Sequence, residues 1–126
     1  MPDIITVQKP WGEYQDIYRT ENVVFKKIII RPNEAISYQI HQKRTECWYV
    51  HKGQGIVKTS EITEPNQTKN YRIQTIERFS FILVPPGMPH QIENNGEEDL
   101  IIYEMQCGEC NEEDIIRLED RYGRTN

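Results

Sequence analysis

The sequence predicts an all-β protein with a short helix at its C-terminus. Glycine and proline clusters interrupt the chain at short intervals, and the segments between them are rich in β-branched and aromatic residues. Only the end of the chain has a helical pattern. Because β-proteins must protect their strand edges, a sandwich, a jelly roll and a closed barrel all fit this pattern.

The predicted strands are short and are joined by tight turns. Glycine in Lys52–Gly55, Pro85–Gly87 and Asn94–Gly96 predicts hairpin turns at these segments. The polar segment Glu61–Asn70 contains a proline and is predicted to be an exposed loop on a long hairpin. The expected strands are Glu13–Arg19, Val23–Arg31, Ile36–His41, Glu46–His51, Gly55–Ser60, Tyr71–Ile76, Phe79–Val84, His90–Glu93 and Leu100–Gln106.

The helix is predicted between Asn111, which can cap its first turn, and Gly123, which would end it. Acidic residues near the N-terminus of a helix are favourable, and apolar residues follow them here. The acidic first turn is Glu112, Glu113 and Asp114, and the apolar body is Ile115, Ile116 and Leu118.

Composition excludes several classes of protein. At 126 residues the chain has the size of one domain, and we expect residues 1–126 to form it. The net charge is -5, from 20 acidic and 15 basic residues, and no basic stripe is present, so nucleic acid is not an expected partner. No apolar stretch is long enough to span a membrane, and the N-terminus lacks the pattern of a signal peptide. The 3 cysteines argue against a disulfide framework, so we expect a soluble, cytoplasmic protein.

Metal-ligating residues are concentrated in two short segments. Residues two apart on a strand share a face, so Gln39 and His41 can point into a barrel while Ile40 points away. His90 lies in the second segment, after a Pro-Gly turn. Glu46 lies an odd number of positions after His41 and therefore needs a turn between them.

The segment Gln42–Thr45 can provide that turn. Glu46, Trp48 and Val50 would then line one side of the next strand, and the same alternation sends His51 to the other face. We therefore expect only two of the three histidines to be ligands.

Together, Gln39, His41, Glu46 and His90 predict a site for one divalent metal ion. A single histidine on a strand is more often a hydrogen-bonded core residue, but four such groups at this spacing favour a metal. Two imidazoles, a carboxylate and an amide oxygen suit zinc first, with manganese, iron, cobalt or nickel as alternatives. Such a site leaves positions open for water or substrate.

Both segments resemble the two motifs of the cupin superfamily. They read Gln39-x-His41-x4-Glu46-x6-Gly53 and Pro85-x-Gly87-x2-His90-x3-Asn94. The resemblance implies the cupin double-stranded β-helix, a jelly-roll barrel. The chain is also similar to one branch, the type II phosphomannose isomerase domain at the C-terminus of bifunctional mannose-1-phosphate guanylyltransferase/mannose-6-phosphate isomerases. The segments that carry this likeness are Lys9-Pro-Trp-Gly12-x-Tyr14, Gln39-x-His41-x2-Arg44-x-Glu46-x-Trp48, Glu104-x-Gln106 and Glu119-Asp-Arg-Tyr-Gly-Arg124.

Two positions depart from that branch. Pro32-Asn33 replaces the usual Pro-Gly, a mild change because asparagine tolerates turn conformations. Gln42-Lys43 replaces a common His-His pair, which changes the surroundings of His41. No nucleotidyltransferase segment precedes these motifs, so we expect no guanylyl transfer from these residues.

The resemblance implies a metal-dependent aldose–ketose isomerase that interconverts mannose 6-phosphate and fructose 6-phosphate. Glu104 and Lys26 are the candidates for the proton-transferring group, and Arg124, then Arg44, for the phosphate-binding residue. Three alternatives stay open: a non-catalytic cupin that binds hexose phosphates, a nucleotide-sugar isomerase or epimerase, and an Fe(II) dioxygenase. The expected partners are a phosphorylated sugar and, because cupins expose strand edges, a second copy in a homodimer.

Overall fold

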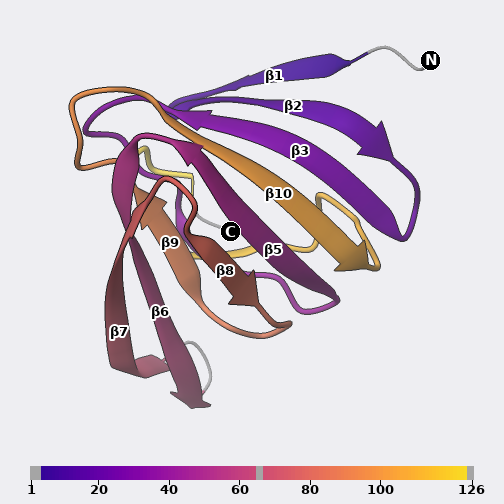
Figure 1. Ribbon diagram of the computed structural model, residues 1–126. Coiled ribbons are helices and arrows are strands. Elements are labelled where there is room, and N and C mark those ends of the chain that lie inside the picture. The colour runs from indigo at the N-terminus through magenta and orange to yellow at the C-terminus, as the bar shows by residue number, and fades with distance from the viewer. Residues whose placement is uncertain (1–3, 65–66, 125–126) are drawn as a thin grey trace.

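The computed structural model describes residues 4–64 and 67–124, and within these ranges the protein is built of two antiparallel β-sheets (Figure 1). The all-β prediction is confirmed. Nothing in the described ranges forms a helix that could cross a membrane.

The larger sheet has six strands in the order β1-β2-β3-β10-β5-β8, and the smaller has five in the order β11-β4-β9-β6-β7. Successive strands from β3 to β6 and from β7 to β11 lie in alternate sheets, which is the winding of a jelly roll. The larger sheet comprises β1 (Ile5–Lys9), β2 (Gly12–Arg19), β3 (Val23–Ile30), β10 (Leu100–Gly108), β5 (Arg44–Lys52) and β8 (Phe81–Val84). The smaller comprises β11 (Ile116–Glu119), β4 (Tyr38–Ile40), β9 (His90–Glu93), β6 (Gln54–Glu64) and β7 (Gln67–Glu77).

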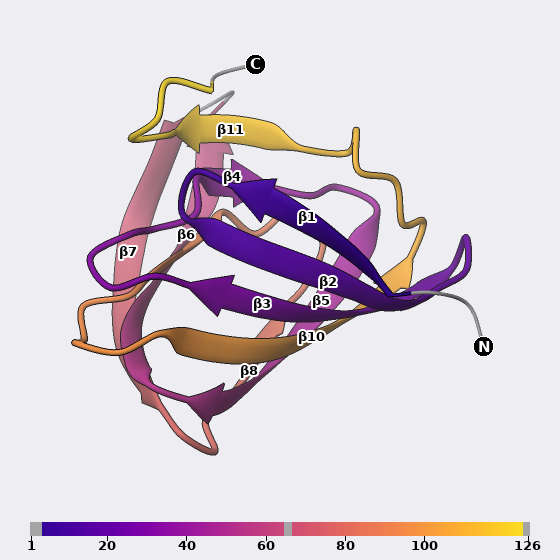
Figure 2. The ribbon, with the colours of Figure 1, turned by 90° about the horizontal axis from the view of Figure 1, so that it is seen from above.

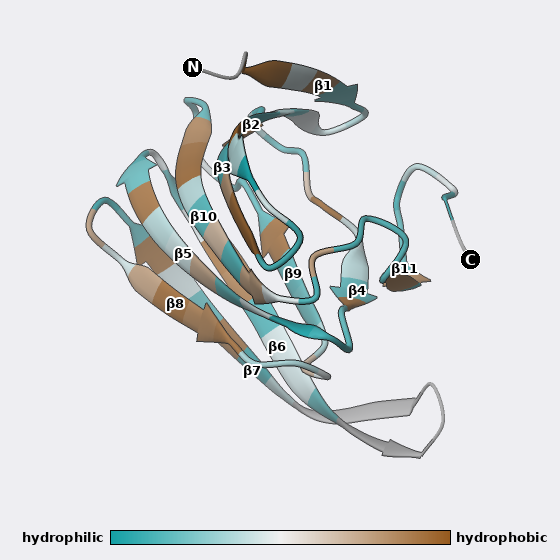
Figure 3. Ribbon diagram, turned by 90° about the vertical axis from the view of Figure 1, so that its right-hand side faces the viewer, coloured by the Kyte–Doolittle hydropathy of each residue, from teal (hydrophilic) through white to brown (hydrophobic). Residues whose placement is uncertain are grey.

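The middle of the larger sheet presents one apolar and one polar region to the interior. On β3, β5 and β10 buried and less buried residues alternate. Figure 3 shows that these strands carry both hydrophobic and hydrophilic residues. At one end the inward residues are apolar, including Ile30, Val50 and Leu100. At the other end Lys26 faces Glu104 across the ladder, and Gln106 and Glu46 form the next row. These polar side chains therefore lie on the same face of the larger sheet as the apolar residues of the core.

The outward face of β3, β5, β10 and the neighbouring β8 exposes apolar side chains. They are Phe25, Tyr49, Phe81, Leu83 and Met105. Exposed apolar patches of this kind are common at interaction surfaces.

The predicted C-terminal helix is wrong. Asn111 does form a turn, because its side chain accepts a hydrogen bond from the backbone N–H of Glu113. The chain then continues as strand β11, which pairs with β4 along the edge of the smaller sheet (Figure 2). An unpaired strand edge offers backbone hydrogen bonds that outweigh the weak helix propensity of a short segment.

Three other expectations differ in extent. Strand β1 was not predicted, and β4 covers only Tyr38–Ile40 of the expected Ile36–His41. The predicted loop Glu61–Asn70 is wrong in its length, because β6 runs to Glu64 and β7 starts at Gln67, while residues 65 and 66 lie outside the described residues.

Two turns depend on their residue types. Asn33 has a φ of 65°, so the asparagine that replaces glycine does adopt the turn conformation expected of it. At Gly12 a Cβ atom would collide with the carbonyl oxygen of Ile29. Glycine is therefore required at the start of β2, where the backbone lies close against β3.

Candidate metal centre

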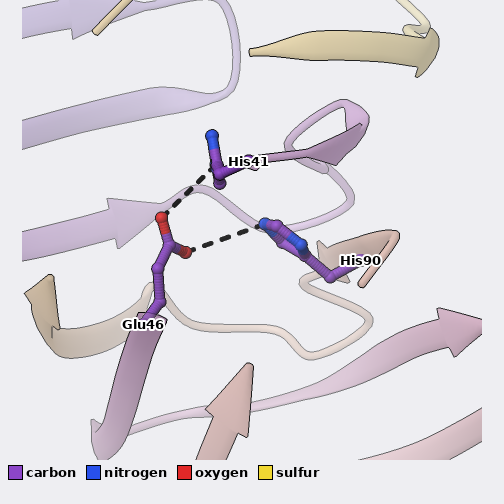
Figure 4. A group of neighbouring side chains, drawn as sticks. All are labelled: His41, Glu46 and His90. Atoms are coloured by element: carbon purple, nitrogen blue, oxygen red, sulfur yellow. Dashed lines mark ion pairs between the residues drawn. The ribbon is translucent and has the colours of Figure 1, made fainter. Parts of the chain in front are cut away.

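Three of the four predicted ligands meet at one point inside the barrel. His41, Glu46 and His90 each bring one ligand atom to within 4.8 Å of the other two, and all three residues are buried. The Nε2 atom of His41 lies 3.3 Å from Glu46 Oε2, and the Nε2 atom of His90 lies 3.7 Å from Glu46 Oε1 (Figure 4). His51 is exposed on the other face of β5, as the strand alternation predicted.

Backbone hydrogen bonds determine which nitrogen of each imidazole is available. The Nδ1 atom of His41 lies 2.7 Å from the carbonyl oxygen of Asp114, and Nδ1 of His90 lies 2.9 Å from that of Met88. A carbonyl oxygen only accepts hydrogen bonds, so both Nδ1 atoms carry the proton and both Nε2 atoms present a lone pair. This is the arrangement that orients histidines for metal binding.

Burial keeps both imidazoles neutral at physiological pH. It lowers the pKa of His90 to about 4, and it lowers the pKa of His41 to about 3, with the positive charge of Arg44 as a further cause. A metal ion would therefore compete with few protons for these nitrogens.

Glu46 is held by two donors from its own strand. The Nε atom of Arg44 donates to Glu46 Oε2 over 2.9 Å, and Nε1 of Trp48 donates to Oε1 over 3.2 Å. Arg44 Nη2 also lies 3.2 Å from Nε2 of His41. All three side chains share the inward face of β5 because they are two residues apart.

The residues fit a divalent cation. The Nε2 atom of His90 is buried and has no hydrogen-bond partner among the described residues, although buried polar atoms nearly always have one. Its closest charged neighbour is an oxygen of Glu46, which is also an acceptor. A cation bound by both would satisfy each of them, and two imidazoles with one carboxylate are a typical ligand set.

Gln39, the fourth predicted ligand, lies beside this group with its amide nitrogen toward it. The nitrogen is 3.3 Å from His41 Nε2, while the oxygen accepts a hydrogen bond of 2.6 Å from Ser37. The amide would have to rotate to offer its oxygen to a metal.

Local interactions of the neighbouring loops fix the position of His41. The backbone N–H of Gly87 donates to the carbonyl oxygen of His41 over 2.8 Å, which joins the two motif segments. The carboxylate of Asp114 accepts hydrogen bonds from the backbone of Gln42 and Lys43. The turn after β4 is thus held by the segment that the sequence had suggested would be a helix.

A cavity of about 180 Å³ opens next to these residues. Every predicted site residue lines it except His90. The lining is Lys9, Trp11, Tyr14, Lys26, Ile28, Ile36, Ser37, Gln39, His41, Arg44, Glu46, Ile92, Glu104, Gln106, Glu112, Ile115, Arg117 and Arg124.

Glu104, predicted as a proton-transferring group, is a buried carboxylate in this wall. Burial, and then the charge of Glu46, raise the pKa of Glu104 to about 7. Its oxygens accept hydrogen bonds from Trp48 Nε1 over 3.0 Å and from Gln106 Nε2 over 2.6 Å. A carboxyl group so positioned can both release and take up a proton near neutral pH.

Lys26, the second candidate, is held differently. Its ammonium group is buried, lies 2.8 Å from Glu112 and lies 4.0 Å from the centre of the Tyr14 ring. Lysine 26 thus anchors the loop after β10 to the wall of the cavity.

The two predicted phosphate-binding arginines line the cavity but have different partners. Arg44 is occupied by Glu46 and also donates to the carbonyl oxygen of Asn111. Arg124 forms hydrogen bonds of 2.9 and 3.0 Å with the two oxygens of Asp120. Their predicted role in phosphate binding stays a prediction.

Sequence reasoning missed the connecting groups. Trp48 donates to two carboxylates at once, which its spacing of two from Glu46 could have indicated. Lys9 and Glu112 lie at the cavity although both are distant in sequence from the metal ligands. Only the Lys-Pro-Trp-Gly likeness had drawn attention to Lys9.

Comparison with known proteins decides the family. The family model described as "Mannose-6-phosphate isomerase C-terminal" matches residues 3–120. The chain belongs to this family. The predicted family membership is therefore confirmed, and with it the cupin fold.

Curated members are larger proteins. The chain is 34% identical over 119 residues to the mannose-1-phosphate guanylyltransferase ManC of Salmonella typhimurium, covering 94% of this chain and 23% of that protein. It is 32% identical over 120 residues to the xanthan biosynthesis protein XanB of Xanthomonas campestris, covering 94% and 24%. The chain thus spans about a quarter of the length of these family members. The first is named as an enzyme and the second as a protein of polysaccharide biosynthesis.

Solved structures support the fold at low sequence identity. The capsular polysaccharide assembling protein CapF of Staphylococcus aureus superposes with a TM-score of 0.80 at 16% identity, covering 94% of this chain and 35% of that one. The Lactobacillus farciminis oxalate decarboxylase formate complex gives a TM-score of 0.74 at 18% identity, covering 91% and 33%.

These comparisons correct one prediction. The interconversion of mannose 6-phosphate and fructose 6-phosphate, predicted as the function, is wrong as an assignment for this family member. Its curated relatives are named for guanylyl transfer or xanthan biosynthesis, and the chain matches under a quarter of them. Membership of the family does not carry that reaction to this chain.

Proposed function

We propose that the chain is a metal-dependent enzyme domain of polysaccharide biosynthesis that moves a proton on the carbon next to the carbonyl of a phosphorylated sugar. The observation that carries the proposal is that Glu104, whose pKa is about 7, lines the same cavity as His41 and Glu46, two of the three candidate metal ligands. The proposal names a class of reaction and of sugar. Aldose–ketose isomerisation, the enzyme type predicted from the sequence, is one member of that class.

The metal would be held by His41, Glu46 and His90, with Gln39 as a fourth ligand after rotation of its amide. Zinc suits these ligands best, because two imidazoles and a carboxylate with an open position are typical of catalytic zinc. When bound, the metal supplies a Lewis acid that stabilises negative charge on a sugar oxygen, an effect of several kcal/mol.

The protein's own groups would carry the proton. The carboxylate of Glu104 takes a proton from the carbon next to the sugar carbonyl. The electron pair of the broken C–H bond forms a carbon–carbon double bond, and the π pair of the carbonyl group passes to its oxygen. The same carboxyl group returns the proton to a carbon, and so no other reactant is consumed. The hydrogen bonds from Trp48 and Gln106 hold Glu104 in place for both steps.

Exchange of carbon-bound hydrogen with solvent tests the proposal directly. Protein loaded with zinc is incubated in D2O with aldose and ketose phosphates of five and six carbons, and deuterium at the carbon next to the carbonyl is followed by NMR. We expect exchange with at least one sugar, and none with Glu104→Gln that still holds zinc. Absence of exchange from every sugar with zinc bound would refute the proposal.

The homodimer and the cytoplasmic location stay predictions. Size-exclusion chromatography with light scattering tests the first.

A further inference from the structure

The outward face of the larger sheet carries two rows of side chains that cross four strands. Strands β3, β10, β5 and β8 lie next to one another in that order (Figure 1). The first row is Phe25, Met105, Cys47 and Leu83, and the second is Lys27, Tyr103, Tyr49 and Phe81. Of these eight residues only Lys27 is charged, although the whole chain has a net charge of -5.

The two rows form a large apolar patch. Phe81 is 64% exposed and Leu83 is 60% exposed, whereas Ile82 between them is buried. Because one buried aromatic side chain covers about 150–250 Å², the exposed parts of the seven uncharged residues amount to roughly 500 Å². The largest apolar patch of a monomeric protein is typically about 300–600 Å² and is often functional.

The area of the patch matches what a stable homodimer needs. An interface of standard size buries about 800 Å² on each partner, and in homodimers about 65% of that area is apolar, which is again roughly 500 Å². This one face therefore supplies the apolar part of a complete interface.

The patch also combines a hollow with a projection beside it. The hollow has a volume of about 460 Å³, and Leu83 lies next to it, opposite Cys47 on the neighbouring strand. In a dimer with two-fold symmetry each copy presents the same patch, so the projecting side chain of one copy can enter the hollow of the other. The residues that line the hollow are Phe25, Cys47, Tyr49, Phe81, Tyr103 and Met105.

The charges favour a second copy as the occupant of this face. A membrane with anionic lipids attracts clusters of lysine and arginine, whereas this chain has a net charge of -5 and the rows contain one cation. Two copies of the face bring no carboxylates of these rows together, so like-charge repulsion within the rows does not oppose their contact.

We propose that the chain forms a homodimer in which the outward faces of β3, β10, β5 and β8 pack against the same faces of a second copy. Sheets packed face to face lie about 10 Å apart, with their side chains interdigitated. None of the eight residues lines the cavity beside the candidate metal centre. The dimer therefore leaves that cavity unchanged, and it requires neither the metal nor the proposed reaction.

Sedimentation equilibrium over a range of protein concentrations tests the interface. The matched comparison is Leu83→Glu with Ile73→Glu, because Ile73 is 69% exposed and lies on β7 of the smaller sheet, outside the two rows. We expect a native dimer whose dissociation constant rises roughly a hundredfold or more in Leu83→Glu, since each copy would bury an unpaired charge. Ile73→Glu should leave the dissociation constant unchanged. Phe81→Glu should act as Leu83→Glu does.

A measurement on the native protein needs no variant. Cys47 lies within the first row, whereas Cys110 lies outside both rows. The rate at which iodoacetamide alkylates Cys47, followed by mass spectrometry of the peptides, should fall as the protein concentration rises into the range of the dimer. The rate at Cys110 should stay constant.

The inference is overturned if the native chain stays monomeric at about 0.1 mM, where a complex of micromolar affinity would be almost fully formed. Equal dissociation constants in Leu83→Glu and Ile73→Glu, or a Cys47 rate that does not change with concentration in a dimeric protein, would assign the interface to another surface. A monomer that sediments with vesicles of zwitterionic lipid would assign the face to a membrane and would also overturn the dimer.

Discussion

The Nε2 atom of His90 lies 3.7 Å from Oε1 of Glu46, both groups are buried, and this nitrogen has no hydrogen-bond partner among the described residues. Two acceptors in this relation repel each other unless a cation lies near both. The arrangement of the interior therefore favours the metal-bound form of the protein.

Zinc should stabilise the folded protein. A ligand that binds only the native state at about 100 times its dissociation constant adds about 2.7 kcal/mol, so added zinc should raise the melting temperature by several degrees. Thermal denaturation with and without zinc measures this. His90→Ala should show no rise, whereas His51→Ala, on the exposed face, should behave as the native protein does. If zinc raised the melting temperatures of His90→Ala and His51→Ala equally, it would have to bind at another site.

Trp48→Phe should destabilise the protein. The change keeps an aromatic ring but removes the N–H that serves both Glu46 and Glu104, and an unsatisfied buried acceptor costs about 1–3 kcal/mol. Urea denaturation measures the loss. Tyr49→Phe, on the outer face of the same strand, should change stability by about 0.5 kcal/mol or less. If the two variants lost the same stability, the hydrogen bonds of Trp48 would have no energetic role.

Glu104→Gln should remove turnover and keep the metal. The amide has the size of the carboxyl group but cannot take up a proton, so the rate should fall by about 10²–10⁴-fold. Hydrogen exchange measures the rate, and elemental analysis of the same sample measures zinc. If Glu104→Gln exchanged hydrogen at the native rate, another residue would have to be the base.

Glu112→Gln should reduce the acid sensitivity of the fold. Burial would raise the pKa of Glu112, but the charge of Lys26 and hydrogen bonds from Lys26 and Arg19 lower it to about 2, below its ordinary value of 4.5. The ion pairs therefore contribute their full stability above pH 4.5 and lose it as pH falls toward 2. Because 48% of the side chain is exposed, the contribution is about 1 kcal/mol or less.

Urea denaturation between pH 7 and pH 3 tests this prediction. The native protein should exceed Glu112→Gln in stability at pH 7, and the difference should shrink toward pH 3. Glu109→Gln, at an exposed carboxylate, is the matched control and should show no such difference. A difference that did not depend on pH would rule out the ion pairs as its cause.

The sequence indicated the grouping of His41, Glu46 and His90 better than the strands and side chains around them. Strand alternation placed Glu46, Trp48 and Val50 on one face and His51 on the other, because that periodicity depends on local geometry alone. The strand Ile116–Glu119 could not be found in this way, since its pairing with β4 depends on an edge that forms only in the folded protein. Likewise, Lys9 and Arg124 line one cavity although they are far apart in sequence, which no local pattern could indicate.

Elemental analysis of the purified protein tests the central claim most directly. After loading with zinc and removal of the excess, the native chain should hold about one zinc ion, and His41→Ala, Glu46→Gln and His90→Ala should each hold almost none while remaining folded. Variants that kept the zinc content of the native chain would contradict the assignment of these three side chains as ligands.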